Sequence, residues 1–302
     1  MDIKPFDAIC FGEILWDLLP WGEKPGGAPM NVAYHLQKLG LNASLISRTG
    51  NDERGGALHH LLSTTGIDTR FMQIDREHKT GIVNATVQAN NEVTYDIVYP
   101  VAWDFIEWER ALSDIVAQSS FFVYGSLAAR HETSYRTLRQ LFEAANTKVL
   151  DINLRPPYFT KVLVEELIAA ADILKLNAHE VSLIAGWYND VKEIKTQVQL
   201  VQERFSVPLI LVTKGEEGAL VCHEGRFSEH QGYSVKVADT VGSGDAFLAA
   251  FLYKMNKGGN IEDNLKFANA LGAFIASKEG ACPDYHIDEV SLLIQSLQPD
   301  QH

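Results

Sequence analysis

Short apolar segments of strand length alternate with longer segments of helical periodicity along most of this chain, and this alternation constrains the fold most strongly. The strand candidates lie at 8–11, 43–47, 121–124, 148–152, 173–176 and 209–213. Helical patterns lie between and after them, near 32–39, 55–65, 107–117, 132–145, 162–170, 191–205, 261–277 and 287–297. Strands separated by helices usually form a parallel sheet with helical crossovers. The chain is therefore predicted to have an α/β fold.

The alternation is interrupted between about residues 71 and 100. Two β-rich segments, 80–87 and 93–99, flank a turn signal at Asn90-Asn91, which predicts an antiparallel insertion. Such an insertion is too small to bury a core of its own, so we expect a lid, a dimer face or both. A second hairpin is predicted at 218–222 and 226–230. We expect one domain, 1–302, with a small β lid from about 13–22 and 71–103.

Composition excludes several classes of protein. The formal net charge is −13, which argues against nucleic acid or an anionic membrane as the main partner. There is no apolar run of about 20 residues, and the first residues lack the pattern of a signal peptide. Cys10, Cys222 and Cys282 are few and far apart, as is typical of reduced thiols. We therefore expect a cytoplasmic protein.

A glycine turn leads into an apolar helix at 239–252. Gly242 and Gly244 permit backbone angles that other residues resist, and Asp245 stands where the helix would begin. Free N–H groups and the positive dipole end of a helix N-terminus bind phosphate or another anion. A carboxylate beside them could accept a proton from an attacking hydroxyl. The alternative is that Asp245 only caps a buried helix.

Other polar residues stand where a ligand could reach them. Asp17 lies among Ile, Leu and Trp, so it is either a surface charge or a ligand for a polar group. The segment 26–31 places small residues and the Asn31 amide at a helix entrance, as a plain loop or as a polyol site. Open α/β sheets bind ligands at the carboxyl ends of their strands, where Arg155 and Asn177 are expected.

Several common catalytic motifs are absent from the sequence. It contains no Gly-x-x-x-x-Gly-Lys-Ser/Thr loop, no complete dinucleotide fingerprint, no His-Glu-x-x-His and no Gly-x-Ser-x-Gly. The missing fingerprint counts against a dinucleotide oxidoreductase, which the α/β alternation alone would allow. Phosphate binding must therefore depend on 242–245.

Four of these stretches together resemble the ribokinase-like (PfkB) family of carbohydrate kinases. They are Gly26-Gly27-Ala28-Pro29-Met30-Asn31 through Gly40, Asn177-Ala-His-Glu180, Val212-Thr-Lys-Gly through Gly218, and Asp239-Thr-Val-Gly-Ser-Gly-Asp-Ala-Phe. The resemblance runs from about residue 7 to residue 297. Within the family, 12–17 and 151–157 are most similar to bacterial fructokinases, with 2-keto-3-deoxygluconate kinase as a close relative.

The resemblance implies a three-layer α-β-α sandwich with a small β-sheet lid, and transfer of the ATP γ-phosphoryl group to a sugar hydroxyl, O6 of D-fructose being favoured. It implies that Asp245 is the base. The anion hole would be formed by Gly242, Ser243 and Gly244. The sugar would be held by Asp17, Gly27, Asn31 and Arg155. The nucleotide would be contacted by Asn177, Thr213, Gly215 and Asn269.

The resemblance also implies bound ions. Glu180 would act on Mg²⁺ through water. A K⁺ site would be formed by Asp239, Val241, Ile275, Lys278, Gly280 and Asp284. Lys278 and Asp284 depart from the residues most common in the family, which weakens this assignment. Apart from the resemblance, a homodimer through the lid is expected because the lid segments are too apolar for a free flap; their apolar residues are Trp16, Leu18, Leu19, Trp21, Ile97, Val98 and Tyr99. Alternatives are another sugar or nucleoside kinase of the family and a non-catalytic sugar-sensing protein.

Overall fold

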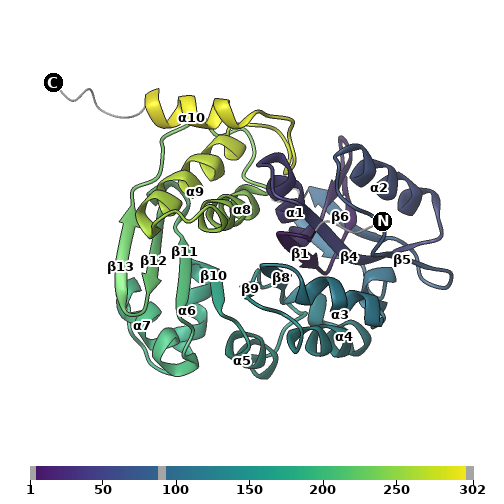
Figure 1. Ribbon diagram of the computed structural model, residues 1–302, viewed down its shortest axis with the longest axis horizontal. Coiled ribbons are helices and arrows are strands. Elements are labelled where there is room, and N and C mark those ends of the chain that lie inside the picture. Colours follow the sequence, from purple (N-terminus) through teal and green to yellow (C-terminus); the bar gives the residue numbers. More distant parts are fainter. Residues whose placement is uncertain (1–4, 88–92, 297–302) are drawn as a thin grey trace.

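A nine-stranded sheet forms the centre of the computed structural model, which describes residues 5–87 and 93–296 (Figure 1). Its strands are β1 (Ala8–Phe11), β4 (Ala43–Gly50), β5 (Met72–Asp75), β8 (Phe121–Gly125), β9 (Lys148–Asp151), β10 (Ile173–Asn177), β11 (Leu209–Thr213), β12 (Ala219–His223) and β13 (Arg226–His230). Their order is β13-β12-β11-β10-β9-β8-β1-β4-β5, and only the pairings of β12 are antiparallel. The predicted parallel sheet is confirmed.

Helices cover both faces of this sheet. One face carries α1 (Ala28–Lys38), α2 (Glu53–Thr64), α8 (Ser243–Asn256), α9 (Ile261–Ala276) and α10 (Ile287–Ser296). The other carries α3 (Arg110–Ala117), α4 (Glu132–Phe142), α5 (Lys161–Ala169), α6 (Ala178–Gly186) and α7 (Ile194–Phe205). The strands feed both cores by alternation, since Cys10 packs in the first cluster and Ile9 and Phe11 in the second. The result is the expected three-layer sandwich.

A second sheet has the order β3-β2-β6-β7 and consists of β2 (Leu15–Leu19), β3 (Gly22–Gly26), β6 (Gly81–Val87) and β7 (Val93–Ile97). The predicted antiparallel pair is confirmed, since β6 and β7 run antiparallel, and β2 adds to β6 in the parallel direction. The expected boundaries differ from the structure. Met72–Asp75 pairs with β4 in the large sheet, so 71–103 is too wide a range for a lid. The small sheet also extends beyond residue 22 to Gly26.

Two elements of the structure, β3 and α6, were not predicted from the sequence, and each has a local reason. β3 is rich in glycine and proline, but it lies at an edge of its sheet, where Pro25 need not donate to a neighbour. Helix α6 was not predicted because it is short; it begins at a capping box between Asn177 and Glu180. The described residues also form three short 3₁₀ helices: η1 (Ala102–Phe105), η2 (Leu127–Ala129) and η3 (Gly215–Glu217). The turn predicted at Asn90-Asn91 lies outside the described residues.

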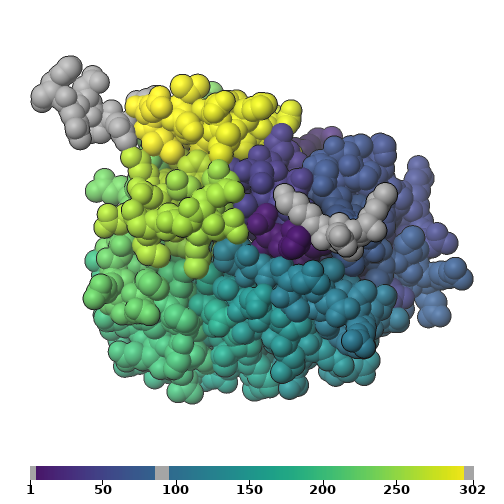
Figure 2. Space-filling model, in the orientation of Figure 1, coloured from purple at the N-terminus to yellow at the C-terminus, as the bar shows by residue number. Residues whose placement is uncertain are grey.

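Distant parts of the chain meet on one side of the large sheet. Helix α1, from the first part of the chain, packs beside α8, and α9 and α10 follow (Figure 1). In the space-filling view the purple N-terminal segments adjoin the yellow-green C-terminal helices (Figure 2). Within the described ranges, no helix has the length and apolar character needed to cross a membrane.

Candidate active site

The N-terminus of α8 is built as the glycine turn predicts. Gly242 is the N-cap with φ of 77°, in the left-handed region, and a Cβ there would lie 2.6 Å from Cα of Ala281. Ser243 donates its N–H to the carbonyl of Thr240 at 3.3 Å. Within 5–87 and 93–296, the N–H groups of Gly242 and Gly244 meet no protein acceptor. Two of the three predicted anion-hole donors are therefore available to a ligand.

Asn31 and Asp245 contact each other across the interface of α1 and α8. The Asn31 amide nitrogen donates to the Asp245 carboxylate at 2.7 Å, and its oxygen accepts from the Cys282 thiol at 3.3 Å. Asn31 is buried, with 4% of its surface exposed. The sequence assigns Asn31 to the sugar, but in the structure its first partner is the predicted base. It therefore orients the carboxylate at the place where a hydroxyl would be deprotonated.

Charges around Asp245 set its proton affinity. Burial raises its pKa to about 6, the carboxylate of Asp151 acts in the same direction, and Lys175, Asn31 and Arg155 oppose the rise. A carboxyl with such a pKa is ionised at neutral pH and still accepts a proton more readily than an exposed aspartate. The site is therefore poised for general-base chemistry near pH 7.

A buried ion pair lies beneath this turn. Lys175 Nζ donates to both carboxylate oxygens of Asp151, at 3.0 and 2.7 Å, and the two residues are register partners on β10 and β9. A Cβ on Gly244 would lie 3.0 Å from Lys175 Nζ, so the ammonium packs against the glycine turn. Burial alone would lower the pKa of Lys175, but the carboxylates of Asp151 and Asp245 keep it raised. The turn is thus backed by a fixed positive charge.

The predicted sugar side lies between the small sheet and α1. Asp17, on β2, is half-buried; burial raises its pKa to about 6 and Arg155 opposes this rise. Gly27 has φ of 119°, and a Cβ there would lie 2.4 Å from the Glu13 carbonyl oxygen. Arg155 also acts electrostatically on Asp245, so its positive charge serves both the sugar-side carboxylate and the base. The structure therefore brings these predicted residues together.

Glu13 is a further buried acid at this place. It is 2% exposed, and its Oε2 has no partner among the described residues. Burial raises its pKa to about 7, and Asp245 adds to the rise. The carboxyl is therefore partly protonated at neutral pH.

The predicted nucleotide side is less unified. Asn177 and Thr213 are register partners at the carboxyl ends of β10 and β11, and Gly215 follows in η3 with φ of 62°. Asn269, however, uses its amide in a 2.8 Å bond to the Leu265 carbonyl of its own helix. Glu180 accepts from the N–H groups of Asn177 and Leu154, each at 2.8 Å. Its carboxylate thus joins the ends of β9 and β10, and only its remaining acceptor capacity is left for a hydrated ion.

The predicted ion ligands are dispersed. Asp239 accepts from the N–H groups of Val241 and Gly280, which closes a loop in front of α8. Lys278 pairs with Glu289, and the exposed carboxylate of Asp284 binds Lys38. Nowhere in the described part of the chain do three His, Cys, Asp or Glu side chains gather as a metal site would require. A K⁺ ion would depend on backbone carbonyls, and Mg²⁺ mainly on nucleotide phosphates and water.

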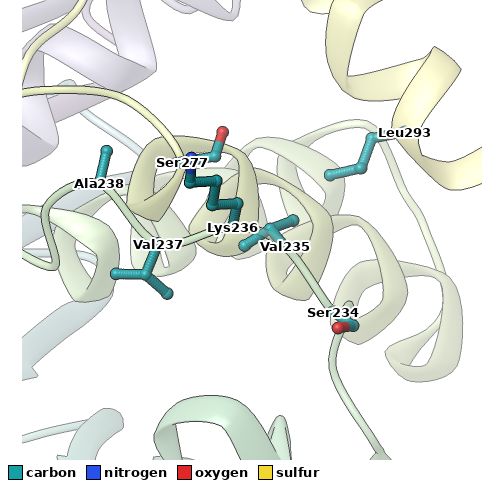
Figure 3. A pocket seen from close by; sticks show the side chains of 7 residues that line it. All are labelled: Ser234, Val235, Lys236, Val237, Ala238, Ser277 and Leu293. Carbon is teal, nitrogen blue, oxygen red and sulfur yellow. The ribbon is translucent and has the colours of Figure 1, made fainter.

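A cavity of about 620 Å³ opens beside the segment that leads into the turn. Ser234, Val235, Lys236, Val237 and Ala238 line it from the segment before α8, opposite Ser277 and Leu293 (Figure 3). None of the four residues assigned to the nucleotide lines this cavity. Its lining ends at Ala238, next to Asp239 in sequence, so the cavity lies beside the segment that leads into the glycine turn.

Sequence reasoning missed Glu13, Asp151 and Lys175 as members of the site. A signal was present for two of them. Ile173 faces the α8 layer, so Lys175, two residues later on the same strand, faces it too, and Asp151 follows Val149 in the same way. A charged side chain on the core-facing side of a strand, at its carboxyl end, predicts a buried partner or a ligand.

A glycine turn, a buried carboxylate and a fixed cation at the carboxyl edge of an α-β-α sheet are the arrangement of a phosphoryl-transfer enzyme that acts on a hydroxyl. Residues 1–288 match the pfkB family carbohydrate kinase model, and the chain belongs to that family.

Curated relatives agree with this class. Probable fructokinase-5 of Arabidopsis thaliana is 29% identical over 304 residues, covering 91% of this chain and 93% of the relative. Fructokinase of Klebsiella pneumoniae is 29% identical over 290 residues, covering 89% and 93%. Among solved structures, the fructokinase of Vibrio cholerae O395 in its fructose, ADP and calcium-bound form superimposes with a TM-score of 0.82 at 24% identity, covering 95% of this chain and 98% of that one. This last likeness supports the fold alone.

Proposed function

We propose that this protein is an ATP-dependent fructokinase that forms fructose 6-phosphate. The observation that supports the proposal most is the Asn31–Asp245 contact at the open N-terminus of α8, because a carboxylate held beside unpaired N–H donors is suited to act as a base for an attacking hydroxyl. Phosphoryl transfer requires alignment and charge stabilisation more than covalent catalysis, and this site provides both. The fructokinase names of the curated relatives favour fructose as the acceptor.

The chemistry follows from the positions of the residues. Asp245 takes the proton from the attacking sugar hydroxyl. As the hydroxyl oxygen bonds to the γ-phosphorus, the bond between the γ-phosphorus and the ADP oxygen breaks. Gly242 and Gly244 donate N–H bonds to the transferred group, while Lys175 supplies positive charge behind them. Asp17 and Arg155 hold the sugar, and Asn177, Thr213 and Gly215 lie along the nucleotide. Mg²⁺, held by phosphates and by water near Glu180, would neutralise negative charge on the nucleotide.

A coupled ADP-release assay across fructose, 2-keto-3-deoxygluconate, ribose and adenosine tests the proposal. We expect the highest kcat/KM with fructose and an absolute requirement for a divalent cation. If the protein binds ATP but releases ADP with none of these acceptors, the kinase assignment would be overturned and the sugar-sensing alternative would be favoured.

Potassium is expected to accelerate turnover. The Asp239 carboxylate closes the loop that enters the glycine turn, so an ion bound to backbone carbonyls there would order the N–H donors. Turnover should be faster in K⁺ than in tetramethylammonium at equal ionic strength. Equal rates would show that the Asp239 contacts order the loop without an ion.

The small sheet is proposed to form a two-fold dimer interface. Trp21 lies between β2 and β3, Tyr95 on β7 and Tyr99 just after β7, and they are 67%, 57% and 48% exposed, which leaves aromatic surface in and beside the small sheet. Trp16 is not part of that surface, since its indole N–H donates to the Arg54 carbonyl. Sedimentation velocity at micromolar concentration should show a dimer, and Trp21→Lys should shift it toward monomer. A wild-type monomer would contradict this arrangement.

A further inference from the structure

A third apolar cluster, separate from the two large cores, joins the small sheet to the body. Val101, Trp103 and Leu127 form its buried part, and Ile97, Val98 and Tyr158 pack against it. Trp103 also contacts the start of β6, because a Cβ on Gly81 would lie 2.6 Å from the indole nitrogen. We call the following residues the root cluster: Val98, Tyr99, Trp103, Asp104, Arg130 and Tyr158.

Arg130 is the centre of the root cluster. Its side chain is 1% exposed and forms two bonds with the fully buried Asp104, at 2.6 and 2.8 Å, and a third with the Val98 carbonyl at 2.8 Å. The guanidinium lies over the rings of Trp103 and Tyr158, 3.8 and 4.6 Å from their centroids. One cation therefore ties together the end of the small sheet, η1 and the loop after β9.

Tyr158 connects this cluster to the predicted sugar site. Its hydroxyl donates to the carbonyl of Ile97, the last residue of β7, at 2.6 Å. Its own N–H donates to the Arg155 carbonyl at 2.8 Å, so Arg155 and Tyr158 belong to one closed turn. Arg155, in turn, acts on Asp17 of β2 and on Asp245. The Tyr158 side chain thus bonds the end of β7 directly to the turn that carries Arg155, the predicted sugar-site cation.

We infer that Tyr158 is a positioning residue that couples the small sheet to Arg155. Through this coupling, the small sheet, which covers the proposed sugar site, and the Arg155 side chain are ordered together. The inference rests on the proposed sugar-kinase function. Without the Tyr158 hydroxyl, the turn that carries Arg155 keeps its ring contact with Arg130 but loses its bond to the sheet. Sugar binding must then order the small sheet and the Arg155 turn separately. This added entropic cost weakens sugar binding but does not change the chemistry of phosphoryl transfer.

Tyr158→Phe tests the inference, and Tyr124→Phe is its matched control. The Tyr124 hydroxyl also donates to a backbone carbonyl, that of Leu167 at 3.3 Å, but inside the core that the α3–α7 helices cover. In Tyr158→Phe we expect KM and Kd for fructose to rise about five- to tenfold, as the loss of one partly buried hydrogen bond predicts. The KM for ATP and the kcat at saturating fructose should stay within about twofold of wild type. Tyr124→Phe should change Tm but neither sugar constant.

Hydrogen exchange in the absence of ligands provides a readout that does not depend on sugar binding. Tyr158→Phe should accelerate exchange at both β7 and 153–160, whereas Tyr124→Phe should accelerate neither. Acceleration at only one of the two segments, or an unchanged fructose Kd in a folded Tyr158→Phe variant, would overturn the coupling. If wild type binds no sugar at all, the kinase proposal fails, and the exchange result alone decides whether the two segments are coupled.

Discussion

Asp245→Asn is expected to lower kcat by about 100-fold or more while leaving ATP binding intact, because asparagine cannot accept the hydroxyl proton. The amide keeps an oxygen that can accept from Asn31, so the 2.7 Å contact need not be lost. Steady-state kinetics with fructose, combined with a nucleotide-binding titration, measure the two effects separately. Near-normal turnover by the folded variant would exclude Asp245 as the base.

The same residue predicts two pH effects. Since its pKa is raised to about 6, kcat/KM should fall as the pH drops through about 6 and the carboxylate becomes protonated. The folded protein then binds this proton more tightly than the unfolded chain does, so Asp245 lowers stability as pH rises from about 4 to about 6. The neutral Asp245→Asn should therefore have the higher Tm above pH 6. Asp190→Asn, on the exposed surface, is the control and should change neither property.

Asp17→Ala is expected to lower kcat/KM for fructose by about 10- to 100-fold, the range for losing hydrogen bonds to a charged acceptor. Asp17 is half-buried on β2, and the positive charge of Arg155 acts on it. Its carboxylate can accept hydrogen bonds from sugar hydroxyls. The same carboxylate repels the carboxylate of 2-keto-3-deoxygluconate. Wild type should therefore prefer fructose, and the preference should narrow in Asp17→Ala.

Both acceptors must be measured on both proteins, with Asp17→Asn as a variant that keeps the size of the side chain and removes the charge. If charge sets the choice, Asp17→Asn should reject the keto-acid less strongly than wild type. A higher kcat/KM for the keto-acid on wild type would overturn the fructokinase assignment and leave the kinase assignment standing.

The sequence predicts the architecture well because periodicity records which side of each element is buried. Six strands of the large sheet are predicted from apolar runs, β12 and β13 as a hairpin, and the three layers from the alternation of strands with helices. β3 and β5 were misassigned because an edge strand needs few apolar residues and pairs on one side only. The local signal in Gly22–Gly26 is therefore that of a loop, although backbone pairing with β2 makes it a strand.

For the site, the sequence predicts the residues that lie within motifs. It misses the residues that become neighbours only when distant segments of the chain pack together. Asp245 and its glycines are adjacent in the chain, so their shared purpose is visible there. Lys175 and Asp151 become partners only when β9 and β10 align, and Glu13 approaches Asp245 only when α1 packs on α8. Conversely, Asn269 and Asp284 stand at the expected positions, but the fold gives their side chains other partners.

Asn31 and Asp245 form a hydrogen bond although they are 214 residues apart, so the ribosome adds Asp245 long after it adds Asn31. At about 5–20 residues per second, a ribosome takes roughly 10–40 s to make that interval. All the described strands are made before or during this interval, but the proposed base is not made until its end. If Asp245 is the base, a chain that stops before α8 would have every described strand of both sheets and would still transfer no phosphoryl group. The proposed activity therefore requires that translation has passed the turn at Gly242.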